Sequence, residues 1–99
     1  MTRERDIEDY LVERVKALGG EVRKVRWIGR RGAPDRIVML PIQHGIGTGG
    51  WHDTAIWVEL KAPGEKAKPH QAREHERMRK MGQRVVIVDS FEGVDDVLS

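Results

Sequence analysis

Two carboxylates occupy positions at which β-strands disfavour acidic residues. Asp35 comes immediately before an apolar run at residues 36–40, and Glu59 lies inside a second run at residues 55–60. Acidic residues are depleted in strands and are seldom buried without a specific role. Carboxylate and water oxygens are the ligands that Mg²⁺ prefers, so two carboxylates that approach from adjacent strands would suit a magnesium site.

A lysine follows Glu59 at strand spacing. Glu59 and Lys61 point to one face of a strand while Leu60 points to the other. Leu60 thus anchors the strand in the core between the two charged residues. Such an ammonium group could orient or deprotonate a water molecule and stabilise charge on a phosphoryl oxygen. The same spacing also suits an ordinary salt bridge on one face of a sheet, and the two interpretations stay open on spacing alone.

The hydrophobic pattern predicts the elements that would position these residues. Apolar residues recur at helical spacing over residues 5–18, and Gly19 and Gly20 then stop the helix. A second helix is expected from Pro69 to about Met81, because proline suits a first helical turn. A short third helix is expected to begin at Ser90. Four apolar segments are expected to be strands: residues 22–28, 36–40, 54–60 and 85–88.

This order of elements predicts an α/β fold with a mixed β-sheet flanked by helices. A right-handed crossover through the second helix would place the last strand parallel to the third. The chain has 99 residues and is expected to form a single domain over residues 1–99. A glycine-rich connection at residues 41–53 has a length and composition that define no geometry, and its role is left open.

Composition excludes several classes of protein. Hydrophobic residues make up 38% of the chain and charged residues 34%, so neither a membrane span nor complete disorder is expected. The chain has no cysteine, which excludes disulfides, thiol nucleophiles and thiolate metal sites. Its first twenty residues are charged throughout and show no targeting segment. We expect a cytoplasmic protein with no membrane attachment and no nucleotide cofactor.

The positive charge is concentrated in two segments. Residues 23–36 hold six Arg or Lys and one acid, residues 61–84 hold eight and three, and residues 85–99 hold four acids and no base. A compact fold could bring the two basic segments together as one electropositive face for nucleic acid. Because the two segments hold a single aromatic residue, Trp27, for base stacking, contacts would be mainly with phosphates.

These residues together resemble a known family. The segments at residues 32–35 (Gly-Ala-Pro-Asp) and 58–61 (Val-Glu-Leu-Lys) are similar to the PD...ExK signature of restriction-endonuclease-like nucleases. More narrowly, the chain resembles the virus-type replication-repair nuclease (VRR-NUC) domain, including its stand-alone phage forms. The agreement includes an acid ahead of the segment at residues 10–12, Gln71 on a helix after Pro69, and a closing strand.

The resemblance implies a role for each matching residue. Asp35 and Glu59 would bind Mg²⁺ or Mn²⁺ with help from the Leu60 carbonyl, and Lys61 would serve the attacking water. Gln71 matches the glutamine of the family. The resemblance also implies a restriction-endonuclease-like fold and metal-dependent hydrolysis of DNA.

The acid on the first helix is less constrained. Glu8 lies inside the apolar arc of that helix, and its distance from Gly19 matches that of the metal-site glutamate in archaeal Holliday junction resolvases. We therefore expect Glu8 to be a catalytic acid of the metal site, either as a direct ligand or through a water molecule. Glu4 falls near the same arc one turn earlier and is kept as the alternative, although acids in a first turn commonly just complement the helix dipole.

The resemblance further implies branched DNA, such as a Holliday junction, as the substrate. Four cations are expected to contact phosphates: Arg30, Arg31, Lys66 and Lys68.

A homodimer is expected, because a small core gains stability when two chains pair and because two symmetric incisions suit a C₂ dimer. Two other functions remain open, namely a non-catalytic DNA-binding module and a phage interaction protein on a nuclease-like scaffold.

Histidines and tryptophans receive weaker assignments. His70 and His75 are five residues apart on the expected helix, not three or four, so a metal-ligand role is rejected for both. His75 shares a helical face with Gln71 and is expected to be packed near the site. Trp27 and Trp57 are expected in strands as core residues, and Trp51 is the tryptophan considered for contact with a partner.

Overall fold

The structure of the protein is a computed structural model that describes residues 1–41 and 55–99. Its elements are α1 (Glu4–Ala17), β1 (Glu21–Lys24), β2 (Arg36–Met39), β3 (Ile56–Leu60), α2 (Pro69–Lys80), β4 (Arg84–Val88) and α3 (Phe91–Leu98). The expected helices and strands are thereby confirmed in order and type. Trp51 and the glycine-rich connection, apart from Pro41, lie outside the described residues.

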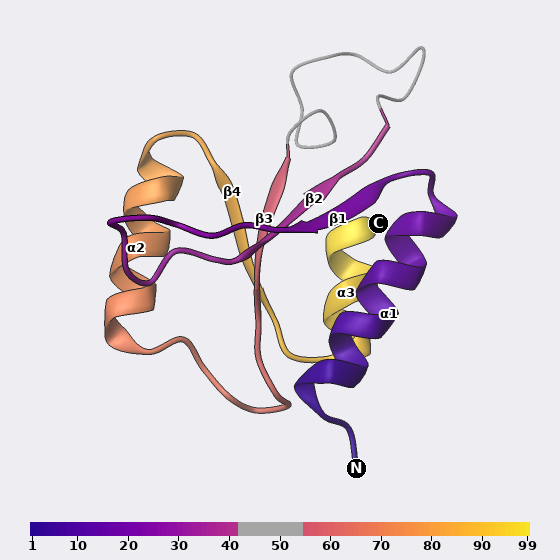
Figure 1. Ribbon diagram of the computed structural model, residues 1–99. Helices are drawn as coiled ribbons and strands as arrows, with labels where there is room; N and C mark the ends of the chain where they lie inside the picture. The colour runs from indigo at the N-terminus through magenta and orange to yellow at the C-terminus, as the bar shows by residue number, and fades with distance from the viewer. Residues whose placement is uncertain (42–54) are drawn as a thin grey trace.

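The four strands form one mixed sheet in the order β1-β2-β3-β4. Strands β1 and β2, and β2 and β3, pair antiparallel, whereas β3 and β4 pair parallel as the crossover through α2 predicts. Helices α1 and α3 cover one face of the sheet, and α2 lies on the other (Figure 1). The predicted mixed sheet flanked by helices is therefore confirmed.

Local sequence explains where the helices begin and how they pack. The side chain of Ser90 caps α3 by accepting a hydrogen bond from the Gly93 amide at 2.9 Å. Helix α1 buries Ile7, Leu11 and Val15, whose spacing puts them on one face of the helix.

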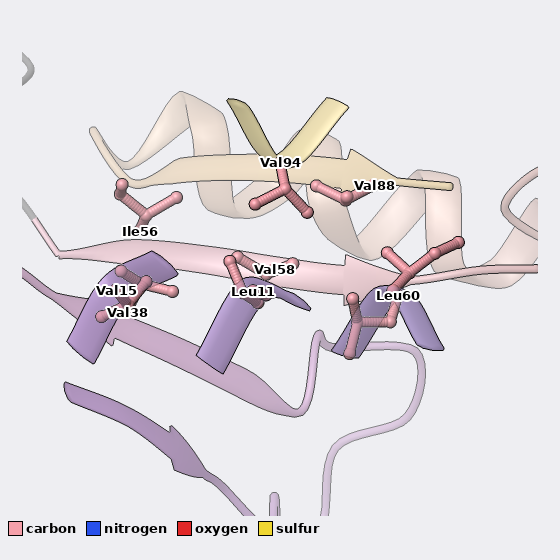
Figure 2. Packing of buried hydrophobic residues seen from close by; sticks show 9 residues of the cluster. Leu11, Val15, Val38, Ile56, Val58, Leu60, Val88 and Val94 are labelled. Carbon is pink, nitrogen blue, oxygen red and sulfur yellow. The ribbon is translucent and has the colours of Figure 1, made fainter. Parts of the chain in front are cut away.

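The hydrophobic core lies between α1, α3 and the face of the sheet that these two helices cover. It is made by side chains from both helices and from three strands, several of them shown in Figure 2: Ile7, Leu11, Val15, Val38, Ile56, Val58, Leu60, Val88 and Val94. No helix in the described part of the chain is both long and apolar enough to span a membrane.

The first strand is shorter than expected. Its pairing with β2 ends at Lys24, and the chain then leaves the sheet through a loop in which Gly29 and Gly32 have φ angles of 74° and 87°. The expectation that Trp27 lies in a strand is therefore wrong. Its indole packs 5.1 Å from the ring of Trp57, and both side chains are half-buried on the face covered by α2 instead of in the main core.

Candidate active site

Asp35 and Glu59 face each other across two neighbouring strands. In the register of β2 and β3, Arg36 pairs with Val58, so one further step places Asp35 opposite Glu59. On its other side, Asp35 lies beside the end of β1: the strand pairing ends at Lys24, and the Val25 amide then donates one further hydrogen bond to the Asp35 carbonyl at 2.9 Å. Directly opposed residues have Cβ atoms roughly 5 Å apart on one face. The register thus places the two acids at neighbouring positions, and the charge of Asp35 contributes to the raised pKa of Glu59.

The two carboxylates differ sharply in exposure. The side chain of Glu59 is 13% exposed and that of Asp35 is 62% exposed. Burial raises the pKa of Glu59 to about 7, and the nearby Lys61 ammonium opposes that rise while the charges of Asp35 and Glu4 add to it. Without a cation, this carboxyl group therefore takes up its proton at a much higher pH than an exposed glutamate.

Lys61 is placed by the helix on the same face. It is 7% exposed, and its Nζ donates a hydrogen bond to Oε1 of Gln71 at 2.9 Å. The same Gln71 oxygen accepts the Lys68 amide at the start of α2, which orients the glutamine. Within the described part of the chain, the partner of the ammonium is therefore Gln71 and not Glu59, so the simple salt bridge is absent.

A close contact joins the Asp35 loop to α2. A Cβ atom added to Gly32 would lie 2.8 Å from the His70 carbonyl oxygen, and the φ of Gly32 is positive. Any side chain at this position would push the loop away from the helix. Glycine thus brings the loop before Asp35 against the helix that holds Gln71, which assembles the site from both directions.

Glu8 and Asp35 are linked by an arginine that sequence reasoning did not assign to the site. Arg36 Nε and Nη2 both lie 2.6 Å from Glu8 Oε2, and Nη1 lies 3.0 Å from Asp35 Oδ1. The Arg36 side chain is only 13% exposed. The one available signal was its place directly after Asp35, at the first position of a strand.

The structure thus relates both acids of α1 to the site in different ways. Glu8 lies on the helix that covers the apolar face and reaches Asp35 through the Arg36 guanidinium. Glu4 is among the charges that raise the pKa of Glu59. Glu8 stays the predicted acid of the site and Glu4 its alternative.

Several of the expected phosphate contacts gather near the start of α2. The pKa of His70 is lowered first by burial and then by the neighbouring cations Arg31, Lys68 and Arg73. Sequence reasoning did not single out Arg73, because nothing in its spacing sets it apart from the other cations of the helix. Lys66 is exposed on the preceding loop.

Arg30, another expected phosphate contact, is already paired. Its Nε lies 3.2 Å from Oε2 of Glu74, which is 3% exposed and also accepts two hydrogen bonds from Arg77. Arg30 itself is about half exposed. Its charge is therefore balanced within the protein more fully than those of Arg31 and Lys68.

The donor set fits a small hard cation that keeps most of its water. Within residues 1–41 and 55–99, no group of three or more His, Asp or Glu side chains is arranged to enclose a metal ion. Asp35 and Glu59 offer two carboxylates, and Leu60, whose side chain is buried, can offer only its backbone carbonyl. Mg²⁺ is typically bound by one or two carboxylates together with waters and substrate phosphate.

Comparison with known proteins assigns the family. No protein-family model matches the chain. Over 90 residues, 91% of its length, it is 43% identical to "Putative nuclease p44" of Acyrthosiphon pisum secondary endosymbiont phage 1, of which it covers 86%. A solved structure titled "VRR_NUC domain" matches 99% of the chain and 96% of its own length, with a TM-score of 0.79 and 42% identity. The chain belongs to the VRR-NUC family.

The residues that carry the resemblance to the VRR-NUC nucleases lie at or beside β2, β3 and α2. Asp35 and Glu59 are opposed across β2 and β3, Lys61 shares the face of Glu59, and Gln71 contacts Lys61 from α2. The restriction-endonuclease-like α/β fold predicted from those motifs is confirmed by the match to the solved domain.

Proposed function

We propose that this VRR-NUC chain is a metal-dependent endonuclease that hydrolyses phosphodiester bonds in DNA. The observation that carries the proposal is the cross-strand pair of Asp35 and Glu59, with Lys61 on the same face of β3 and held by Gln71. The electropositive surroundings of His70 favour a polyanionic substrate beside this site.

In this proposal Asp35 and Glu59 hold Mg²⁺ or Mn²⁺, with the Leu60 carbonyl as a further oxygen donor. The cation would supply Lewis-acid polarisation of the scissile phosphate. The pKa of Glu59 supports the assignment, because a buried carboxyl group beside two other acids is one that a cation stabilises in its charged form. Glu8 acts on Asp35 through Arg36 and not by direct contact.

Lys61 acts on the attacking water. Its ammonium is nearly buried and is aimed by the Gln71 side chain, whose own position is fixed by the Lys68 amide. A donor held in this way can orient the water and neutralise charge that develops on a phosphoryl oxygen without reorganising during the reaction. Gln71 is then a positioning residue.

Branched DNA and a homodimer complete the proposal. The part of the chain that the structure describes supplies one site of this kind, whereas resolution of a four-way junction requires two incisions. A C₂ dimer places two sites about an axis that can match the symmetry of the junction. Since a similar protein is carried by a phage, we further propose that the chain acts in the cytoplasm of a bacterial host.

The test is cleavage of plasmid DNA and of a four-way junction in Mg²⁺, in Mn²⁺ and in EDTA. Cleavage in both metals and none in EDTA, with the junction preferred to plasmid, is the expected result. Equal cleavage in EDTA would refute metal dependence. Tight DNA binding without cleavage would mean a non-catalytic module, and neither binding nor cleavage would favour a phage interaction protein.

The dimer is tested separately by light scattering coupled to size exclusion at micromolar protein. We expect twice the chain mass of 11.3 kDa. A mass near 11.3 kDa at every concentration, with junctions still cut as paired nicks, would refute the dimer.

A further inference from the structure

His75 is buried beside the candidate site with its polar atoms unused. Its side chain is fully buried, and neither ring nitrogen, Nδ1 or Nε2, has a hydrogen-bond partner within residues 1–41 and 55–99. In the same part of the chain, the two His75 nitrogens are the only buried side-chain nitrogen or oxygen atoms without a hydrogen-bond partner. Leaving a buried donor unpaired costs on the order of 1–3 kcal/mol. An apolar residue would avoid that cost, so the histidine calls for an explanation.

The ring of His75 lies beside the more buried of the two opposed carboxylates. His75 Nε2 lies 3.5 Å from Glu59 Oε1, just beyond hydrogen-bond distance. A displacement of roughly 0.5 Å by either side chain would bring the two atoms to the ordinary N–H···O separation. The contact therefore needs only a side-chain adjustment and no rearrangement of the fold.

The placement of His75 follows from a match between two periodicities. His75 and Gln71 are four residues apart on α2, a rise of about 6 Å on one face of a helix. Glu59 and Lys61 are two residues apart on β3, a rise of about 6.6 Å on one face of a strand. The helix thus runs beside the strand so that Gln71 meets Lys61 and His75 meets Glu59.

Burial also bears on the form of the ring. The side chain is fully buried, and burial disfavours the charged imidazolium. The neutral imidazole carries a single N–H. One nitrogen is then a donor and the other is not, and the carboxylate lies beside Nε2.

We propose that His75 is a positioning residue that donates its Nε2–H to Oε1 of Glu59 and so presents the other carboxylate oxygen to the cation. This inference rests on the proposed metal-dependent activity and adds to it a partner for Glu59. Groups that hydrogen-bond to a metal ligand orient it, and their loss typically weakens metal binding about 10- to 100-fold. Gln71 and His75 would then form one row on α2 that sets Lys61 and Glu59 together.

The first test measures Mn²⁺ binding by calorimetry in the absence of DNA, alongside cleavage as a function of Mn²⁺ concentration. His75→Leu removes the donor in similar volume, and His75→Gln keeps a donor. Met78→Leu, on the next turn of the same buried face, is the matched control. We expect binding about 10- to 100-fold weaker in His75→Leu, substantial recovery in His75→Gln and no change in Met78→Leu.

A second measurement uses the wild-type protein and does not depend on any variant folding. Imidazole ¹⁵N NMR identifies which ring nitrogen carries the proton. We expect a His75 ring protonated at Nε2, with a slowly exchanging proton when Mg²⁺ is present. A ring protonated at Nδ1 would overturn the proposal.

The outcomes separate this inference from the proposed function. If wild-type protein binds Mn²⁺ and cleaves DNA while His75→Leu binds Mn²⁺ equally well, only the role of His75 is refuted. The same conclusion follows if His75→Gln is as defective as His75→Leu. If wild-type protein neither binds Mn²⁺ nor cleaves DNA, the metal-dependent function fails and the role of His75 fails with it.

Discussion

The two faces of strand β3 serve different ends. Ile56, Val58 and Leu60 point into the core under α1 and α3 and are almost entirely buried. The intervening residues Trp57, Glu59 and Lys61 point toward α2. Because successive side chains of a strand alternate between faces, one five-residue strand and the residue after it serve both the core and the candidate site.

The comparison teaches that stability and chemistry are separated by face rather than by region of the chain. Apolar burial on one face stabilises the fold, whereas on the other face a carboxyl group is kept partly from water and next to other acids. Substitutions at neighbouring positions of β3 should therefore affect different properties, namely stability on the core face and cleavage on the face toward α2. Variants along the strand can test this.

The largest effect is expected on cleavage from the polar face. Asp35→Ala and Glu59→Ala should each reduce DNA cleavage by roughly 10³-fold or more, because a site with two protein carboxylates loses its cation with either one. Both variants should keep the fold and DNA binding. Lys61→Ala should still bind metal but cleave poorly. Wild-type turnover in either carboxylate variant would show that the metal assignment is wrong.

The next effect is on stability, from the opposite face. Ile56→Ala should lower the free energy of unfolding by about 2–5 kcal/mol, because Ile56 is 1% exposed in the core and the truncation leaves a cavity. Urea denaturation measures it. At a temperature where the variant is folded, the cleavage rate should stay close to that of the wild type. A variant as stable as the wild type would contradict the division between the faces.

A smaller and pH-dependent gain in stability is expected at Glu59. Its pKa is raised to about 7 in the fold from 4.5, so between these values the folded protein binds more protons than the unfolded chain. Stability therefore falls as pH rises through that window and the penalty is complete above pH 7. Glu59→Gln removes it and should stabilise the metal-free protein by roughly 1–3 kcal/mol at pH 8.

The same variant should gain little near pH 4.5, where the folded state holds the proton and the unfolded chain holds it about half of the time. Thermal unfolding at the two pH values measures the difference, and Asp35→Asn is the matched control, since its side chain is 62% exposed. An equal gain for Glu59→Gln at both pH values would mean that burial of the charge is not the cause.

The choice between the two α1 acids can be sharpened with a further pair of variants. Glu8→Gln should weaken cleavage by about tenfold, because the Arg36 guanidinium would then be shared less evenly between Glu8 and Asp35. Glu4→Gln should change cleavage little. It should slightly lower the pKa of Glu59, because the charge of Glu4 is one of those that raise this pKa. A larger loss in Glu4→Gln would make Glu4 the acid of the site.

Sequence patterns were sufficient for the apolar face and for part of the polar one. Helical spacing in α1 and the apolar runs predicted the elements, because burial of one face imposes a period. The approach of Asp35 and Glu59 from neighbouring strands could also be predicted, since both acids lie in or beside apolar segments. The roles of Arg36 and His75 were not, because their meaning lies in contacts between α1, α2 and the sheet that no local period encodes.

The smallest effects are expected among the cations around His70. Arg31→Ala, Lys68→Ala and Arg73→Ala should each weaken duplex binding modestly and make the slope of log K against log[salt] less negative by about 0.9, if each side chain neutralises one phosphate.

Arg23→Ala is the matched control for these variants, because Arg23 lies on β1 and is paired with Glu21. Arg30→Ala should have a smaller effect than Arg31→Ala, since Arg30 is held by Glu74. Filter binding or fluorescence anisotropy between 50 and roughly 200 mM salt measures each slope. Equal slopes for wild-type protein and all three variants would place the DNA on another surface and separate the cations of α2 from the chemistry beside them.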